Sequence, residues 1–191
     1  NVQSDHLSVP RVKQLQKMSN EVDKNHSDYM EGAKVGDFIN TVTGENYGQE
    51  MLIVNVHFKE EFVAWKKREV GGGLLGSYPS HEAAVEAIAE QGVAQEDTEI
   101  IQTQTHSLLK VDEKTMEISD IPFLFDCASS KLRVSREWNT QITKLGGDRF
   151  ASLWKMSSVS TANRKGQAFM NISISNVGWL TEEIYNQAKD F

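Results

Sequence analysis

The sequence predicts an α+β or mostly β protein, built on an antiparallel sheet or a small barrel with two or three peripheral helices. Three observations support this class. Residues 51–58 carry an apolar side chain at every second position without interruption, and 99–111 alternates again and is rich in Ile, Thr and Gln, as strands are. About six or seven segments have strand character, whereas only two or three have helix character. The strands also follow one another as in hairpins, without the strict alternation of strand and helix that a parallel sheet requires.

Strands are predicted from alternation and from turn residues. In 51–58 every second side chain is apolar, so this set is expected to face the core: Leu52, Val54, Val56 and Phe58. A separate aromatic and basic strand is expected at 61–70, where the triple glycine 71–73 ends it. The other expected strands are 36–44, 99–111, 118–127 with Pro122 favouring an edge or a bulge, and a hairpin of 151–159 and 167–175.

Helices are predicted from caps and from apolar side chains at helical spacing. Residues 80–91 follow a candidate N-cap, Ser80, and end at Gly92. Residues 129–145 carry one apolar stripe and stop at two glycines; the stripe is Val134, Trp138, Ile142 and Leu145. A short helix is expected at 181–191 with Thr181 as its cap. A weaker helical stretch is expected at 12–18.

Length and composition fit one domain with an arm. The chain has 191 residues, 39% of them hydrophobic and 25% charged, which is enough apolar residues to bury a core. We expect an N-terminal arm at 1–34 and a single domain at 35–191. No apolar run of about 18 residues occurs, so no membrane association is expected. The single cysteine, Cys127, cannot form an internal disulfide and favours a reducing, cytoplasmic location.

Charge is unevenly distributed along the chain, whose net charge is −7. Residues 75–126 hold eleven acidic and two basic side chains, whereas 129–170 hold eight basic and two acidic ones. Local charge attracts phosphates within a Debye length of about 10 Å, so the basic segment is compatible with nucleic-acid binding despite the acidic total. The alternative is that the two segments neutralise each other within the fold.

Motifs of catalysis and of metal binding are missing from the sequence. The five histidines show no metal-ligand spacing, and the triple glycine lacks the Gly-Lys-Ser/Thr ending of a phosphate loop. No nucleophile motif surrounds a serine, and Cys127 has no charged activator nearby in the sequence. We therefore expect a protein that is not an enzyme and that carries no metal and no cofactor.

Aromatic residues interleaved with basic ones give the main functional signal. Binding a single strand requires cations for the phosphates and flat rings on which unpaired bases stack. The candidate nucleic-acid-binding residues are Trp65, Lys66, Lys67, Arg68, Lys131, Arg133, Arg136, Phe150, Trp154, Lys155, Arg164 and Lys165. For Trp65 and Trp154 core packing remains an equal alternative, and for Trp138 core packing is the favoured interpretation.

Several of these stretches resemble a family of tailed-bacteriophage replication proteins. The similar segments are GDFIN at 36–40, FVAWKKR at 62–68 with the triple glycine, DCASSK at 126–131, REWNT at 136–140 and ANRKG at 162–166. The family is that of phage single-stranded-DNA-binding proteins with an OB fold. The resemblance implies coating of single strands during phage DNA replication and recombination, in the cytoplasm of a bacterial host. Such proteins usually end in an acidic tail that recruits partners, but this chain ends in Ala188-Lys189-Asp190-Phe191.

Two function classes follow, and a third is weaker. The first is sequence-independent binding of single-stranded DNA, with phage replication proteins and a second copy of the chain as further candidate partners. The second is a non-enzymatic protein-interaction or host-regulating role for the acidic face of residues 75–126. The third is an enzyme whose site is scattered beyond sequence recognition.

Overall fold

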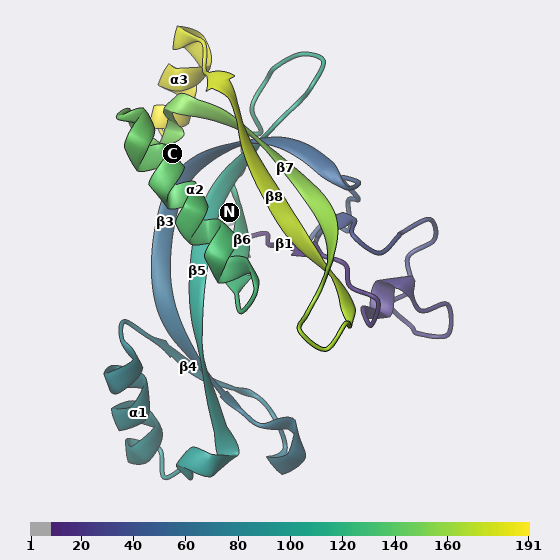
Figure 1. Ribbon diagram of the computed structural model, residues 1–191, viewed down its shortest axis with the longest axis vertical. Coiled ribbons are helices and arrows are strands. Elements are labelled where there is room, and N and C mark those ends of the chain that lie inside the picture. Colours follow the sequence, from purple (N-terminus) through teal and green to yellow (C-terminus); the bar gives the residue numbers. More distant parts are fainter. Residues whose placement is uncertain (1–8) are drawn as a thin grey trace, which may run out of the picture.

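An antiparallel sheet forms the body of the protein. The computed structural model describes residues 9–191 (Figure 1). The strand order is β6-β5-β3-β7-β8, and β4 pairs with the far half of β3. The edge strands β6 and β8 do not pair with each other, so the sheet is open within the described residues. The antiparallel α+β class is confirmed, with these strands: β3 (Glu50–Lys66), β4 (Leu74–Tyr78), β5 (Thr98–Val111), β6 (Phe123–Ala128), β7 (Ser152–Ala162) and β8 (Ala168–Trp179).

Strand β3 is 17 residues long and replaces the two strands expected at 51–58 and 61–70. It pairs with β7 only through Glu50–Val54 and with β4 only through Phe62–Trp65. The ladder with β5 runs along most of its length, from Leu52↔Val111 to Lys66↔Thr98. β3 and β5 therefore extend from the main sheet into a second unit at the lower end of Figure 1. We call residues 62–102 the distal lobe and the remaining described residues the main body.

The predicted inward face of β3 is one of two faces that contact a core. Val54 from the predicted set is fully buried in the smaller core cluster, where Leu52 and Val56 pack against it. Met51 and Ile53 on the other face are buried in the larger cluster, which the sequence did not predict. The register of β3 against β5 shifts between Asn55 and His57, and this bulge moves the following side chains to the other face. Both faces of the main sheet are covered, so period-2 alternation alone could not identify the core side.

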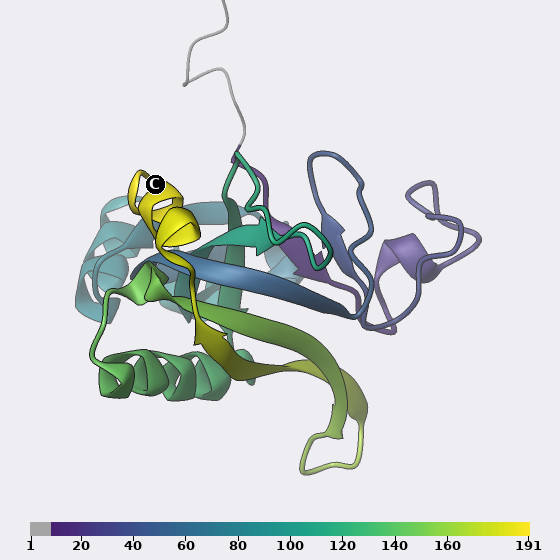
Figure 2. The ribbon, with the colours of Figure 1, turned by 90° about the horizontal axis from the view of Figure 1, so that it is seen from above.

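Helices cover the two faces of the sheet. Helix α2 (Lys131–Leu145) packs over the larger core cluster, which includes Trp138, Trp154 and Phe125, and it contacts both edge strands β6 and β8. Helix α3 (Glu182–Lys189) places Ala188 against Val54 and Leu109 on the opposite face. Figure 2 shows α2 and α3 on opposite sides of the sheet.

All three predicted helices after residue 79 are confirmed, including two of their caps. Helix α1 (His81–Glu90) starts after Ser80, whose Oγ accepts a hydrogen bond from the N–H of Ala83 at 3.1 Å. The Oγ1 of Thr181 accepts one from the N–H of Ile184 at 3.4 Å, as predicted for α3. The hairpin of β7 and β8 is also confirmed, and Pro122 precedes an edge strand as expected.

Two short strands near the N-terminus pair with each other, and the residues after the first of them contact the edge strand β8. The helix expected at 12–18 was wrong, because β1 (Val12–Gln14) pairs with β2 (Phe38–Asn40) as a strand. The side chain of Gln16 accepts from the N–H of Met170 in β8 and donates to its carbonyl, both at 2.9 Å. The expected boundary at residue 34 stays a prediction, and residues 1–8 of the expected arm lie outside the described residues.

Candidate nucleic-acid interface

Trp65 lies on an open face of the distal lobe. Its side chain is 41% exposed, and its cross-strand neighbour Leu74 is 60% exposed. The adjacent residue Ala64 is fully buried because it points to the other face, where α1 packs. The long ribbon is thus covered by a helix on one face only. An exposed tryptophan on an uncovered sheet face is available to stack on a flat ligand.

The cations that follow Trp65 surround the turn between β3 and β4. The Nζ of Lys67 donates to the carbonyl of Glu96 at 2.6 Å, and Lys66 is half-buried. Arg68 is exposed and makes no salt bridge within residues 9–191. Gly71, Gly72 and Gly73 all have positive φ, between 66° and 117°, a region that favours glycine. The triple glycine therefore closes the turn that presents Arg68.

Two of the four basic residues of α2 are engaged with other side chains. Arg133 forms a salt bridge with Glu137 one turn later, at 2.8 Å between Nε and Oε1. Arg136 donates to the side chain of Gln102 at 3.1 Å, which links α2 to the distal lobe. Lys131 opens the helix and is half-buried. Only part of the predicted basic path along α2 is therefore free in this conformation.

The tip of the β7–β8 hairpin carries two free cations. Arg164 and Lys165 are exposed and have no salt-bridge partner in the described part of the chain. The Oδ1 of Asn163 accepts from the N–H groups of Lys165 and Gln167, and Gly166 has a φ of +76°. The turn is thus internally hydrogen-bonded and holds both basic side chains toward solvent.

The predicted cluster at 149–155 is mainly structural. Trp154 is fully buried in the larger core cluster, so its predicted base-stacking role does not fit its position. Phe150 is half-buried with its ring 5.1 Å from that of Tyr185, and Lys155 is paired with Glu50 at 2.7 Å. Alternation along β7 aims every second side chain at the core, and sequence alone does not say which set this is.

Sequence reasoning missed Trp179, which is 59% exposed and so the most exposed tryptophan. Just before Trp179 the pairing of β8 with β7 is irregular, because the register shifts between Leu153 and Trp154 of β7. Gly178, the residue that precedes Trp179, has a φ of +147°. A Cβ at Gly147 would lie 3.1 Å from the ring of Trp179, a tight contact that a shift of the ring by a few tenths of an ångström would relieve. The Trp-Leu-Thr sequence before a helix carried no signal for this exposure.

Buried polar groups form a chain through the core that resembles a nucleophile and its base. The Nε2 of His106 lies 2.7 Å from the Oγ of Ser135, and its Nδ1 lies 2.9 Å from the Nδ2 of Asn55. Burial lowers the pKa of His106 to about 3. All three side chains are fully buried beneath Trp138, which stacks on His106 at 4.5 Å. We interpret this chain as structural, because a substrate has no access to it.

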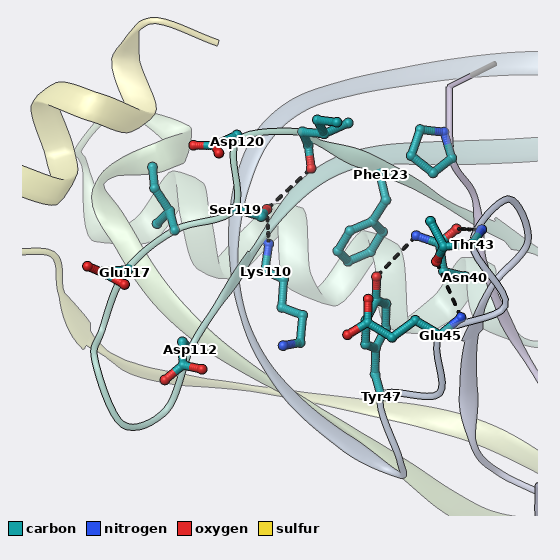
Figure 3. A pocket seen from close by; sticks show the side chains of 13 residues that line it. Asn40, Thr43, Glu45, Tyr47, Lys110, Asp112, Glu117, Ser119, Asp120 and Phe123 are labelled. Carbon is teal, nitrogen blue, oxygen red and sulfur yellow. Dashed lines mark hydrogen bonds between the residues drawn. The ribbon is translucent and has the colours of Figure 1, made fainter. Parts of the chain in front are cut away.

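A pocket with an acidic rim lies away from these cations (Figure 3). It measures about 480 Å³ and lies between the 40–47 loop and the segment after β5. The carboxylates of its lining are those of Glu45, Asp112, Glu117 and Asp120. Lys110 points inward with its Nζ 5.2 Å from the ring centre of Tyr47. Within residues 9–191 no group of three or more His, Cys, Asp or Glu side chains is placed to hold a metal ion.

The acidic and basic segments do not neutralise each other through ion pairs. No salt bridge among the described residues joins 75–126 to 129–170. In the distal lobe α1 and the residues after it expose a set of acidic side chains without salt-bridge partners within residues 9–191: Glu82, Glu86, Glu90, Glu96 and Glu99. The molecule therefore keeps an acidic surface and separate basic ones.

Comparison with known proteins places the chain among phage proteins. No curated protein and no solved structure matches it. No helix within residues 9–191 has the length and apolar character needed to cross a membrane. The model of one family, described as Pam3 phage gp34-like protein, matches residues 1–191. Since this match covers the whole sequence, the chain belongs to the Pam3 phage gp34-like protein family.

Proposed function

We propose that this phage protein binds single-stranded DNA without sequence preference, in the replication or recombination of phage DNA. The observation that carries the proposal is Trp65, an exposed ring on an uncovered sheet face beside Lys66, Lys67 and Arg68. Stacking on an aromatic ring contributes about 1–3 kcal/mol per base and tolerates any base. The free cations of the β7–β8 tip, Arg164 and Lys165, add phosphate contacts. In this proposal the chain acts by binding and not by catalysis.

The test is tryptophan fluorescence during titration with an oligo(dT) strand at low and at moderate salt. Trp65 and Trp179 are exposed whereas Trp138 and Trp154 are buried, so quenching reports on the two exposed rings. We expect saturable quenching and an affinity that falls with salt, because phosphate contacts release counterions. Absence of quenching at both salt concentrations, together with an unshifted gel, overturns the proposal.

Replacing Trp65 separates stacking from charge. Trp65→Ala is expected to weaken oligo(dT) binding by roughly 5- to 150-fold at every salt concentration, as loss of one stacked base predicts. Arg68→Gln, three residues later and exposed, is the matched variant for charge. It is expected to make the slope of log affinity against log salt shallower by about 0.7, the value for one phosphate contact. Equal affinities for wild type and Trp65→Ala would remove this face from the interface.

A second candidate is a protein-interaction role for the acidic side of the distal lobe. It is favoured by the carboxylates of α1, which have no salt-bridge partners among the described residues. Failure to bind oligo(dT), combined with binding of a host protein that is lost when Glu82, Glu86 and Glu90 become Gln, would place this function first.

A further inference from the structure

A groove with three cationic side chains runs between β1, β6 and the start of α2. It measures about 430 Å³, and its charged lining residues are Arg11, Lys13, Asp126 and Lys131. Arg11 and Lys131 are 120 positions apart in the sequence, and the fold brings them to the same groove. We call this surface the cationic groove. It is separate from the acidic pocket of Figure 3, which shares none of these residues.

Two of the three cations are already neutralised. The Nε of Arg11 lies 2.9 Å from Asp126, and the Nζ of Lys13 lies 2.8 Å from Glu21. Lys131 differs: it is half-buried, yet its ammonium group makes neither a salt bridge nor a hydrogen bond within residues 9–191. Burial lowers the pKa of Lys131. Its Nζ is not one of the buried side-chain atoms that lack a partner within residues 9–191, so it still reaches solvent and is accessible to an anion that enters the groove.

The local field around Lys131 also favours an anion. Lys131 is the first residue of α2, where the helix dipole is positive, and the first turn contains no acidic side chain. The preceding Ser130 makes no side-chain capping bond. A cation at this end of a helix is destabilising unless a negative group lies nearby. The groove, the free ammonium and the helix N-terminus thus all favour a negatively charged ligand.

The position of the groove connects it to the free cations of the hairpin. The side chain of Asn171 in β8 donates to the carbonyl of Ser130 at 3.4 Å, and Gln16 of the groove binds the backbone of Met170. The strand that leads from the hairpin tip therefore passes directly beside the groove. A chain of phosphates lying along β8 would reach Lys131 and Arg164 in turn.

We propose that the cationic groove binds a phosphate group of a nucleic-acid strand, with Lys131 as the phosphate-binding cation. The choice of a nucleic-acid strand as the ligand rests on the proposed function. The group that the groove recognises is phosphate, which an oligonucleotide and the free ion share. Arg11 and Lys13, which the aromatic and basic pattern of the sequence did not mark, form the walls of the site.

The test compares Lys131→Gln with Lys144→Gln in the full chain. Both variants remove one lysine charge from α2, but Lys144 is exposed in its last turn and outside the groove. Affinity for oligo(dT) is measured over a range of salt. Lys131→Gln is expected to make the slope of log affinity against log salt shallower by about 0.7, whereas Lys144→Gln keeps the wild-type slope. Lys131→Gln should keep or raise the midpoint of thermal unfolding, because an unpaired cation is removed from the positive end of the helix dipole.

Titration with inorganic phosphate separates the groove from the proposed function. Amide chemical shifts of residues 128–133 are expected to move in the wild type and in Lys144→Gln but not in Lys131→Gln. If the wild type binds oligo(dT) but both variants share its slope and no amide moves, the groove is wrong and the proposed function stands. If oligo(dT) does not bind while phosphate moves these amides, the proposed function fails and the groove remains a phosphate site. A lower unfolding midpoint in Lys131→Gln with an unchanged slope would show a structural role instead.

Discussion

His106 is held neutral by its surroundings, and this has a consequence for stability in acid. The ring is fully buried between Trp138 and Phe58, and both ring nitrogens have polar neighbours, Asn55 and Ser135. Burial lowers its pKa from 6.5 to about 3, and the nearby Arg149 acts in the same direction. The unfolded chain therefore binds a proton between about pH 6.5 and pH 3 that the folded chain does not bind.

Stability is expected to fall as the pH falls through this window, by about 1.4 kcal/mol per pH unit from this group. Urea unfolding at a series of pH values between 7.5 and 4 measures the slope. His106→Gln should be less stable at pH 7.5 but should show a weaker loss of stability in acid. His57→Gln, on the neighbouring strand and exposed, is the matched control. An unchanged pH slope in His106→Gln would contradict a neutral, buried His106.

At the scale of elements, the N-terminal segment is attached to the sheet by side chains that replace a strand pairing. The amide of Gln16 makes both hydrogen bonds that a neighbouring backbone would offer to Met170 in β8. The Oγ of Ser158 in β7 donates to the carbonyl of Gly36, and Gly36 has a φ of +96° with the Met170 side chain directly against it. This attachment closes part of the open side of the sheet.

Gln16→Ala is therefore expected to lower the free energy of unfolding by about 1–3 kcal/mol, because two backbone groups of a half-buried strand lose their partners. Gln16→Glu keeps the acceptor for the N–H of Met170 but loses the amide donor. Its loss of unfolding free energy should therefore be intermediate at acidic pH. The loss should be larger near neutrality, where the carboxylate faces a carbonyl oxygen. Denaturant unfolding at both pH values gives the comparison. Equal stability of Gln16→Ala and wild type would show that this attachment is not used in solution.

Helix α1 carries a repulsive stripe. Glu82, Glu86 and Glu90 are spaced four residues apart, and like charges at this spacing destabilise a helix by about 0.2–0.5 kcal/mol per pair. Glu86→Lys converts both pairs into attractive ones and is expected to raise the unfolding free energy by up to about 1 kcal/mol, more at low salt than at high salt. Glu86→Gln should give about half of this gain. A loss of stability in Glu86→Lys would show that the stripe has a partner within the fold.

Elements with local signals were predictable, and positions set by tertiary contacts were not. The caps Ser80 and Thr181 and the glycines after α2 defined helices from the sequence because caps act within one turn. The inward face of β3 depends on a bulge and on cover from both sides, and neither leaves a local pattern. For the same reason the sequence could not separate buried Trp154 from exposed Trp65, since both lie beside lysines on strands.

At the scale of the whole molecule, the two candidate binding features lie in different units. Trp65 and the acidic helix α1 belong to the distal lobe, whereas the cationic groove and the hairpin tip belong to the main body. The charge pattern of the sequence corresponds only in part to a spatial separation, since Asp112, Glu117 and Asp120 of the acidic segment line a pocket of the main body. If the chain binds a nucleic-acid strand as proposed, the acidic side chains of α1 would repel the strand from one side of the distal lobe and leave the tryptophan face as the approach.

The distal lobe is joined to the main body chiefly by two neighbouring strands, β3 and β5, with Arg136 reaching across to Gln102. Only β3 and β5 cross the boundary, since β6 pairs no further than Thr103 and β4 pairs no further than Phe62, so we expect this connection to bend more easily than the five-stranded sheet. We expect the separation between the tryptophan face and the cationic groove to vary while each remains intact. A bound strand would then fix the angle of this connection, and its length, more than its sequence, would determine which angle is adopted.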